Sequence, residues 1–274
     1  MSMRIDGKKI QNEIGVQLRS DFLGLKKVCT LAIIVVGDNP IVDSFIRIKK
    51  HFAREVGVCV IEKKFPDNVQ FLELKKTLDM LRDNPEINGI IIQLPLPNTL
   101  DTQMILNYIP ESKDVDVLSF TLVEKFKKNL SPILPPVVAA IKEILQVSSV
   151  DIKNKNILVL GNGRLVGEPA SVWLRQNGAK VQTIDNLTSI TDVVTDIADI
   201  IICGAGSAGI IKPEMVKSGV ILIDAGTSEL NGVMVGDLDP RCEAKASLFT
   251  PVPGGVGPIT VAMIFRNLYI LNNK

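Results

Sequence analysis

Short, β-branched apolar runs separated by helix-length segments are the feature that most constrains the fold of this chain. Three such runs occupy the first half of the chain: TLAIIVVG at 30–37, VCVIEKKF at 58–65 and INGIIIQLPL at 87–96. Each is typical of a buried strand. Residues 40–56 and 70–83 between them show helical spacing, with Asn39 and Pro40 as N-cap and first-turn residue of the first helix. This alternation predicts an α/β fold with parallel strands covered by helices.

A second series of strand-like runs begins near residue 156 and predicts a second α/β domain. Its members are NILVLG at 156–161, AKVQTI at 179–184, ADIIICG at 198–204 and GVILIDAG at 219–226. Helical patterns at 165–177 and 189–197 alternate with them, and the proline-rich segment 128–137 is typical of a domain boundary. A last helix is expected to start at Pro258 and to return to the first domain. We therefore expect a domain of residues 1–135 joined by 258–274, a Rossmann-type domain of residues 136–257, and a cleft between them.

The composition excludes several classes of function. The 31 basic and 30 acidic residues give a net charge of +1 and are dispersed along the chain, which argues against nucleic-acid and membrane partners. Residues 1–11 lack the apolar stretch of a signal peptide, and no apolar run approaches the ~20 residues of a spanning helix, so we expect a cytoplasmic protein. The single histidine, His51, excludes a multi-histidine metal site, and we expect no metal. Of the four cysteines, three (Cys29, Cys59 and Cys203) adjoin apolar runs and are predicted to be buried, reduced thiols.

The turn after the run at 156–161 has the glycine pattern of a dinucleotide-binding site. Gly161, Gly163 and Gly167 have the spacing GxGxxxG between a predicted strand and a predicted helix. Glycines there let the turn tighten, and they let backbone N–H groups approach a pyrophosphate at the positive end of the helix. A tight strand-to-helix turn could also need glycine for its geometry alone. The position inside a β-α-β unit favours the nucleotide site.

Asp185 bears on the choice of nucleotide, because it ends the next predicted strand, about 20 residues past the glycines. An acid at that position hydrogen-bonds the ribose hydroxyls of the adenosine and repels a 2′-phosphate, which favours NAD over NADP. The alternative is a turn or helix-cap role in the Asp185–Asn186 pair. Arg164 lies close enough in sequence to influence the same choice, whereas position 162 holds Asn162 and no arginine.

Three further segments combine strand ends with unusual loops. They are IIQLPLP at 91–97, SKDVDVLS at 112–119 and TPVPGGVGPIT at 250–260. The last is poor at forming a helix or a central strand, and it suits either a backbone held against a ligand or a rigid connector. Together these segments resemble the bifunctional methylenetetrahydrofolate dehydrogenase/methenyltetrahydrofolate cyclohydrolase family. The resemblance extends over nearly the whole chain, which looks like a divergent member.

The resemblance implies which residues bind the folate. Gln93 would line the folate site, with Pro95 in its wall, and Asp116 would grip the pterin ring through a bidentate, charge-assisted contact. A turn formed by Pro253, Gly254 and Gly255 would abut the same ligand. The family usually has glycine after the aspartate, whereas this chain has Val117.

The resemblance also implies a catalytic helix in VGDNPIVDSFIRIKKHF at 36–52. The family places a tyrosine four residues before an essential lysine, and these positions hold Phe45 and Lys49, which share a helix face. Lys49 would transfer protons if burial lowers its pKa, with Gln93 orienting its ammonium. Phe45 can stack on the folate rings but cannot hydrogen-bond the lysine. For Lys49 alone, the alternative is a solvated lysine on a helix.

The expected cofactor is NAD or NADP, of which NADP is the family's common choice. The residues expected to bind it are Gly161, Asn162, Gly163, Arg164, Gly167, Asp185, Gly206, Gly226 and Thr260. The family's usual proline–cysteine–threonine–proline–x–glycine run appears here only as PILPPVV at 132–138. Its Cys-His-Ser strand end is replaced by Ile184–Asn186, so the folate face is better preserved than the adenine-ribose face.

The resemblance implies oxidation of 5,10-methylenetetrahydrofolate to 5,10-methenyltetrahydrofolate with NAD(P)+, followed by hydrolysis to 10-formyltetrahydrofolate. Hydride transfer depends mostly on positioning the one-carbon bridge of the folate against the nicotinamide. The resemblance also implies a homodimer formed through the nucleotide domain. Two alternatives remain: another two-domain NAD(P) dehydrogenase, and a non-catalytic folate- or nucleotide-binding relative. The first is not expected to combine Gln93, Asp116 and the PGGVGP string, and the second would account for the missing tyrosine.

Overall fold

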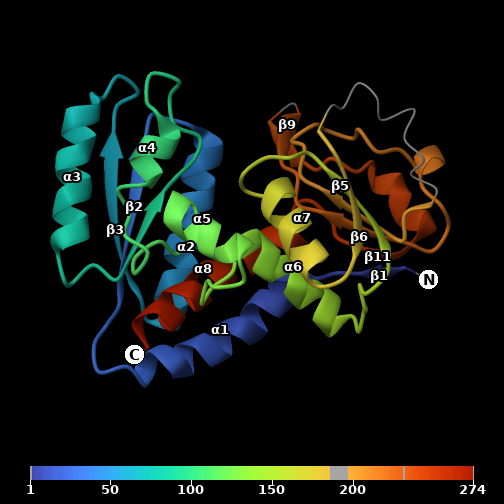
Figure 1. The fold of residues 1–274 in the computed structure, drawn as a ribbon, viewed down its shortest axis with the longest axis horizontal. Helices are drawn as coiled ribbons and strands as arrows, with labels where there is room; N and C mark the ends of the chain where they lie inside the picture. Colours follow the sequence, from blue (N-terminus) through green and yellow to red (C-terminus); the bar gives the residue numbers. More distant parts are fainter. Residues whose placement is uncertain (1, 186–196, 231, 274) are drawn as a thin grey trace. The chain divides into compact units, whose positions relative to one another are not determined.

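The computed structural model describes residues 2–185, 197–230 and 232–273, and the chain divides into two compact units (Figure 1). Met1–Gln11 and Val137–Thr260 form a unit around a six-stranded sheet, which we call the six-stranded unit. Asn12–Pro136 and Val261–Lys274 form a unit around a three-stranded sheet, the three-stranded unit. Within the described ranges, no helix has both the length and the apolar character needed to cross a membrane. The two α/β units confirm the predicted fold class.

The sheet of the three-stranded unit is parallel and has the order β3-β2-β4. Its strands are β2 (Thr30–Val36), β3 (Cys59–Phe65) and β4 (Gly89–Ile92). The helices of this unit are α1 (Gly7–Leu23), α2 (Pro40–Val56), α3 (Phe71–Asp83), α4 (Thr102–Leu106), α5 (Phe120–Lys127) and α8 (Val256–Asn272), of which α1 and α8 begin in the six-stranded unit. In Figure 1, α3 covers one face of the sheet, and α2 and α8 lie on the other. The central strand is therefore buried on both faces, as its continuous apolar run predicts.

The predicted start of α2 and the predicted return of the last helix are both present. The Asn39 Oδ1 atom accepts a hydrogen bond from the Val42 N–H at 3.3 Å, which caps the helix that starts at Pro40. The ring of Phe265 in α8 lies 5.3 Å, centroid to centroid, from the ring of Phe52 in α2. Helix α8 begins at Val256, two residues before the expected start at Pro258.

The prediction of a buried thiol was wrong for Cys59, which is exposed, whereas Cys29, Cys203 and Cys242 are buried. Cys59 lies on β3, which has only one neighbour in its sheet. Side chains on β3 alternate between exposed and partly buried positions, so an apolar run at this edge does not imply burial.

The sheet of the six-stranded unit has the order β1-β11-β8-β7-β5-β6, and its strand pairs are parallel. These strands are β1 (Met3–Arg4), β5 (Asn156–Leu160), β6 (Lys180–Ile184), β7 (Ile200–Cys203), β8 (Val220–Asp224) and β11 (Ala246–Phe249). The other elements are α6 (Pro136–Val147), α7 (Gly167–Gln176), the 3-10 helices η3 (Pro213–Met215) and η4 (Pro240–Lys245), and an antiparallel pair of β9 (Ser228–Leu230) and β10 (Val233–Val235). Apart from Ile197, the helix expected at 189–197 lies outside the described residues.

The N-terminal segment belongs to the six-stranded unit, whereas it was expected in the other domain. Strand β1 pairs in parallel with β11, so that Met3 lies opposite Leu248. The Gly7 N–H then donates a hydrogen bond of 2.8 Å to the Gly254 carbonyl. Because β1 pairs with β11, which is distant in sequence, residues 1–11 belong to the six-stranded unit.

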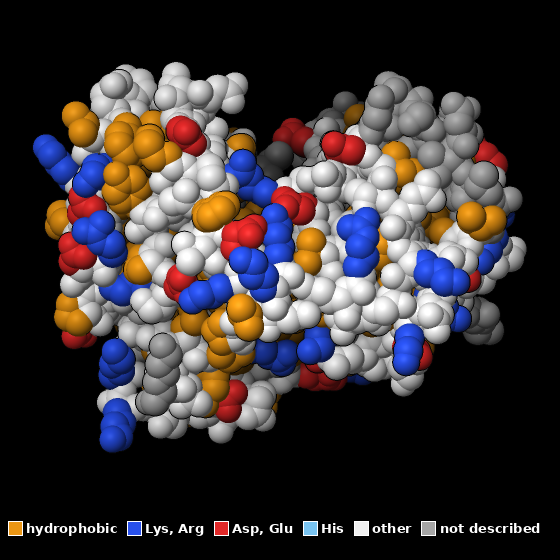
Figure 2. Space-filling model, in the orientation of Figure 1, with side chains coloured by type: hydrophobic (Ala, Val, Ile, Leu, Met, Phe, Trp, Pro, Cys, Tyr) orange, Lys and Arg blue, Asp and Glu red, His pale blue; other side chains and the backbone are white. Residues whose placement is uncertain are grey.

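The strand order of the six-stranded sheet has a topological switch point at β5, where the chain adds strands first on one side and then on the other. From β5, the chain runs first to β6 on one side and then to β7 on the other. In open parallel sheets, ligands bind beyond the carboxyl ends of the strands at such a switch point. Figure 2 shows basic and acidic side chains interspersed over the face in view, as their dispersal in the sequence suggests.

Candidate active site

Lys49, Gln93 and Asp116 are brought together within the three-stranded unit. Lys49 lies on α2, Gln93 directly follows β4, and Asp116 lies in the loop between α4 and α5. The Lys49 Nζ donates a hydrogen bond of 2.6 Å to the Gln93 Oε1. Asp116 is near enough for its charge to raise the pKa of Lys49, against the larger effect of burial.

The side chain of Lys49 is only 8% exposed, which rules out a solvated lysine on a helix surface. It occupies the buried stripe of α2, on which Val42, Ile46 and Ala53 also lie at helical spacing. An apolar residue would be expected at this position of the stripe. A lysine in its place requires a polar partner, and Gln93 supplies one.

The charges of this cluster influence each other's protonation. Burial lowers the pKa of Lys49 from its usual value, while the neighbouring Asp116 opposes that shift. Burial also raises the pKa of Asp116 to about 6, with Lys49 opposing the shift and Asp114 adding to it. Both pKa values thereby move towards neutral pH, and a group whose pKa lies near the working pH exchanges protons more readily.

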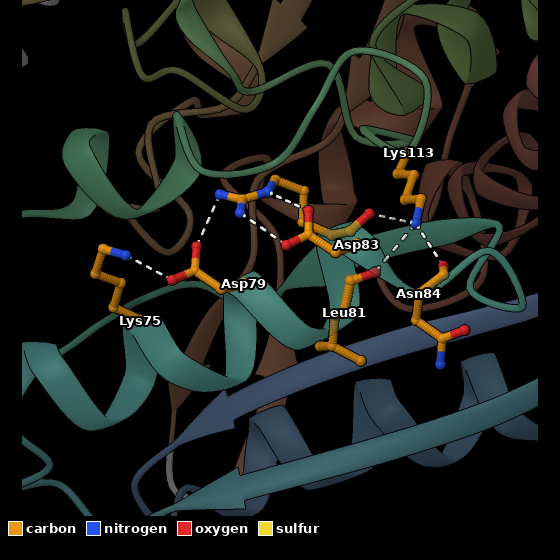
Figure 3. A network of polar contacts seen from close by, with 7 residues as sticks. Lys75, Asp79, Leu81, Asp83, Asn84 and Lys113 are labelled. Carbon is orange, nitrogen blue, oxygen red and sulfur yellow. Dashed lines mark hydrogen bonds and ion pairs between the residues drawn. The ribbon is translucent and has the colours of Figure 1, made fainter.

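The loop that carries Asp116 is anchored by two residues that precede it, Lys113 (Figure 3) and Asp114. The Lys113 Nζ donates to the carbonyls of Leu81, Arg82 and Asn84 at 3.1, 2.7 and 2.7 Å, at the end of α3. The carbonyls of Leu81 and Arg82 belong to the last turn of α3, where no intrahelical donor remains for them, and Asn84 is the C-cap residue of that helix.

Asp114 anchors the same loop from inside. Its Oδ2 atom accepts hydrogen bonds from the N–H groups of Leu118 and Ser119, at 3.0 and 2.8 Å. Sequence reasoning assigned a role only to the second acid of SKDVDVLS, and it missed Asp114 and Lys113. The signal available was the lysine–aspartate pair that precedes Asp116 in that string.

Val117, which follows Asp116, has a backbone φ of +58°. This is the left-handed region, where a β-branched residue is sterically strained and glycine is not. The family's usual glycine at this position therefore matches the local backbone, and valine occupies a glycine conformation. The Val117 side chain is 2% exposed, so its burial offsets part of the strain.

We expect Val117→Gly to be more stable than Val117→Ala. Both variants lose buried methyl groups, but only glycine relieves the strain, which is worth about 1–2 kcal/mol. This order of stability, with glycine above alanine, is the reverse of the usual one, in which glycine costs about 0.5–1 kcal/mol relative to alanine. Urea unfolding of the two variants measures the difference.

Val115, which is buried in the same loop without a positive φ, is the control: Val115→Ala should be more stable than Val115→Gly. The same order at both positions would contradict the strain at Val117.

The remaining residues predicted to bind folate are divided between the two units. Phe45 is partly buried on α2, one turn before Lys49, and Pro95 is exposed after a cis peptide bond with Leu94. Pro253, Gly254 and Gly255 lie in the six-stranded unit.

The backbone conformation and close packing of the turn at 254–255 already require glycine at these positions. Gly254 has a φ of +105°, and a Cβ atom at Gly255 would lie 2.6 Å from the Pro251 carbonyl oxygen. A Cβ atom at Gly7 would lie 1.9 Å from the Gly255 carbonyl oxygen. The compact backbone thus accounts for both glycines without a ligand, and their contact with folate stays a prediction.

The glycines at the end of β5 have distinct structural reasons. Gly161 has a φ of +85°, and a Cβ atom there would lie 2.6 Å from the Gly204 carbonyl oxygen. A Cβ atom at Gly167, the first residue of α7, would lie 1.9 Å from the Gly161 carbonyl oxygen. A Cβ atom at Gly163 would meet nothing within 4 Å. Two of the glycines are therefore required by packing, and the space at Gly163 fits the close approach of a dinucleotide.

The other residues predicted to bind the cofactor lie at or near the carboxyl edge of the sheet. Asn162 and Arg164 are exposed in the glycine turn, and Asp185 is exposed directly after β6. Gly206 follows β7 with a φ of +65°, and Gly226 follows β8. In contrast, the hydroxyl of Thr260 donates to the Val256 carbonyl, at 3.1 Å, within its own helix.

A parallel sheet with a glycine turn at its switch point defines the six-stranded unit as a Rossmann-type nucleotide-binding domain, joined here to a second α/β unit. Residues 135–274 match the family model described as tetrahydrofolate dehydrogenase/cyclohydrolase, NAD(P)-binding domain, and residues 5–116 match the model of the catalytic domain of the same family. The chain belongs to the tetrahydrofolate dehydrogenase/cyclohydrolase family.

Individual relatives agree with this assignment over the full chain. The bifunctional protein FolD of Nautilia profundicola is 37% identical, over 96% of this chain and 94% of its own length. The crystal structure of the bifunctional enzyme FolD from Campylobacter jejuni is 31% identical, with a TM-score of 0.93 over 100% of this chain and 99% of that one. The Trypanosoma brucei enzyme, solved with NADP cofactor and an inhibitor, is 29% identical, with a TM-score of 0.94 over 99% of this chain and 97% of that one.

Proposed function

We propose that this chain oxidises 5,10-methylenetetrahydrofolate to 5,10-methenyltetrahydrofolate with a nicotinamide dinucleotide and hydrolyses the product to 10-formyltetrahydrofolate. Membership of the dehydrogenase/cyclohydrolase family supports both activities. The observation that carries the proposal is the hydrogen bond between the buried Lys49 and the partly buried Gln93, with Asp116 near enough to act on the lysine, in the unit that matches the catalytic domain. Family membership also disfavours the alternative of an unrelated two-domain dehydrogenase.

In the proposed site, Asp116 binds the amino and ring N–H groups of the pterin through its two carboxylate oxygens. The ring of Phe45, one turn from Lys49, stacks on the flat folate rings. Pro95 would line the same site, while folate contacts of Pro253, Gly254 and Gly255, which belong to the six-stranded unit, stay a prediction from the resemblance. These contacts hold the one-carbon bridge in place, and positioning is the main requirement of the dehydrogenase step.

Lys49 serves the hydrolytic step as the proton carrier. Water adds to the methenyl carbon, and ring opening then needs a proton moved from the added oxygen to the leaving nitrogen. A lysine with a lowered pKa performs such transfers at neutral pH. Gln93 fixes the lysine, because its Nε2 donates to the Leu94 carbonyl at 3.0 Å and its Oε1 is left facing the ammonium.

Residues of the six-stranded unit would hold the nicotinamide cofactor, which would supply the hydride acceptor when bound. The open space at Gly163 fits the pyrophosphate, next to the start of α7. Asn162, Arg164 and Gly167 complete the same turn, while Gly206, Gly226 and Thr260 are proposed to contact the rest of the nucleotide. Asp185 would take the ribose hydroxyls.

We expect NAD to be used at least as well as NADP. The carboxylate of Asp185, exposed at the end of β6, would repel a 2′-phosphate. Absorbance of methenyltetrahydrofolate, followed with NAD and NADP in parallel, tests both the activity and the preference through kcat/KM. A preference for NADP of about tenfold or more, equal to ~1.4 kcal/mol, would mean that a basic residue such as Arg164 binds the phosphate. No turnover with either cofactor would favour the non-catalytic relative.

The finer expectations from the resemblance stay predictions. They are a homodimer formed through the nucleotide domain, a cytoplasmic location, and a site that uses neither a metal nor nucleic acid. Sedimentation of the purified protein as a monomer at micromolar concentration would contradict the first of these.

A further inference from the structure

Two buried aspartates, which the proposed chemistry does not use, lie at the carboxyl edge of the six-stranded sheet. Asp224 ends β8 and is 2% exposed, and Asp237 follows β10 and is 0% exposed. Buried carboxylates are costly unless hydrogen bonds satisfy them, so the donors around each identify what it holds in place.

Asp237 holds the loop that follows β7. Its Oδ2 atom accepts hydrogen bonds from the N–H groups of Ala205 and Gly206, at 2.7 and 3.2 Å. Its Oδ1 atom accepts one from the N–H of Ser207, at 2.7 Å. One carboxylate therefore binds three successive backbone amides, and it fixes the path of the loop 204–207.

Asp224 connects three segments, because it is hydrogen-bonded to Gly226, Leu238 and Thr250. Its Oδ1 atom accepts from the Gly226 N–H at 3.0 Å, and its Oδ2 atom accepts from the Leu238 N–H at 2.9 Å. The second bond reaches the residue next to Asp237 in the chain. The backbone N–H of Asp224 donates to the Thr250 Oγ1 at 2.7 Å, which adds the start of the segment 250–260.

The two carboxylates are locked reciprocally by glycines. A Cβ atom at Gly226, two residues after Asp224, would lie 2.2 Å from the Asp237 Oδ2. A Cβ atom at Gly236, the residue before Asp237, would lie 2.1 Å from the Asp224 Oδ2. Each carboxylate thus packs closely against a glycine in the other's segment, where a side chain would displace it. Burial raises the pKa of Asp224 to about 7, with the Leu238 N–H opposing the shift and the charge of Asp237 adding to it.

The loop held by Asp237 lies beside the glycine turn of the nucleotide site. The carbonyl oxygen of Gly204 would be 2.6 Å from a Cβ atom at Gly161, at the switch point between β5 and β7. The N–H groups of 205–207 all bond to Asp237, and Gly206 in the middle of this loop is exposed.

We propose that Asp237, locked by Asp224, is a positioning residue that holds the loop 204–207 in the shape that receives the nicotinamide cofactor. The inference rests on the proposed function and adds a residue pair to it. Asp237 acts through the loop backbone and would not itself touch the reacting atoms.

The test is Asp237→Asn, which keeps the size of the side chain but replaces one acceptor oxygen with an NH2 donor. Either the Ser207 N–H or the pair at Ala205 and Gly206 then faces a donor. We expect the KM for the nicotinamide cofactor to rise about tenfold or more, since hydrogen bonds to a charged acceptor are lost. Hydrolysis of methenyltetrahydrofolate needs no nicotinamide, so its rate should stay within about twofold of wild type. Hydrogen exchange at 205–207 should be faster.

Asp239→Asn is the matched control, two residues further along the chain. The Asp239 Oδ1 atom accepts from the Arg241 N–H at 2.9 Å and caps η4, and it makes no hydrogen bond to the loop. Both activities should survive this change. Gly236→Ala is a second variant, because its added methyl group displaces Asp224 while the charge of Asp237 is kept, and it should give the same selective rise in KM.

Parallel loss of both activities in a folded Asp237→Asn protein, or an unchanged cofactor KM, would overturn the inference. If Asp237→Asn does not fold, Gly236→Ala decides by the same two criteria. Wild-type protein that lacks both activities would instead contradict the proposed function.

Discussion

Lys49→Met should lower the rate of methenyltetrahydrofolate hydrolysis by ~10²–10⁴-fold, the usual contribution of a positioned acid or base. Methionine keeps the approximate length and the apolar stem, so packing in the buried stripe of α2 should survive, but it cannot carry a proton. The decay of methenyltetrahydrofolate absorbance, corrected for the uncatalysed rate, measures the loss. Dehydrogenase activity should fall less, because hydride transfer needs positioning and no proton carrier from the protein.

Lys50→Met provides the control for this experiment. Lys50 is the next residue of α2, and its ammonium forms a surface ion pair with Glu62, which contributes little to stability. This variant should hydrolyse methenyltetrahydrofolate at nearly the wild-type rate. Equal rates for Lys49→Met and wild type would show that the buried lysine does not carry the proton.

Asp116→Asn should raise the KM for the folate by about 100-fold, because a neutral amide cannot pair two anionic oxygens with the pterin N–H groups. The wild-type KM should also depend on pH. The pKa of Asp116 is raised to about 6, so its carboxylate is charged above that pH and neutral below it. The folate KM should therefore rise as the pH falls through about 6, and this rise should be absent in Asp116→Asn.

Initial rates at several folate concentrations, measured on both sides of pH 6, test the two parts of this prediction. Asp101→Asn is a suitable control, since Asp101 caps α4 through the Met104 N–H and asparagine caps a helix equally well. A wild-type KM that is flat through this range, with the variant unchanged, would remove Asp116 from the folate site.

The elements that could be predicted from the sequence are those with strong local patterns. The apolar runs became β2, β3, β4, β5, β6, β7 and β8, and Asn39–Pro40 correctly marked the start of α2, whereas β11 was not predicted. Strand β1 was missed, because two residues carry no period and their pairing partner is β11, near the other end of the chain. Helix α6 was missed because the prolines just before it and at its start suggested a linker, whereas Pro136 is its first residue, where proline is tolerated.

The candidate site was predictable to a similar extent. The resemblance pointed to Lys49, Gln93 and Asp116, and spacing on a helix and at a strand end explains why the first two can meet. The residues that hold the loops of the site in place could not be predicted, because their partners are distant in sequence. Lys113 bonds to carbonyls at the end of α3, and Asp237 bonds to amides after β7. The positive φ of Val117 could not be inferred either, because valine is among the residues least suited to it.

The pairing of β1 with β11 also bears on how the protein is made. Neither unit is one continuous stretch of chain, because Asn12–Pro136 separates the two parts of the six-stranded unit. A fragment that started at Val137 would lack β1 and expose the backbone edge of β11, the kind of free edge that invites aggregation. Closing a contact over so long a separation is also slow. The nucleotide-binding half therefore cannot finish folding during synthesis until the strand 246–249 has left the ribosome, and until then β1 has no partner strand in its sheet.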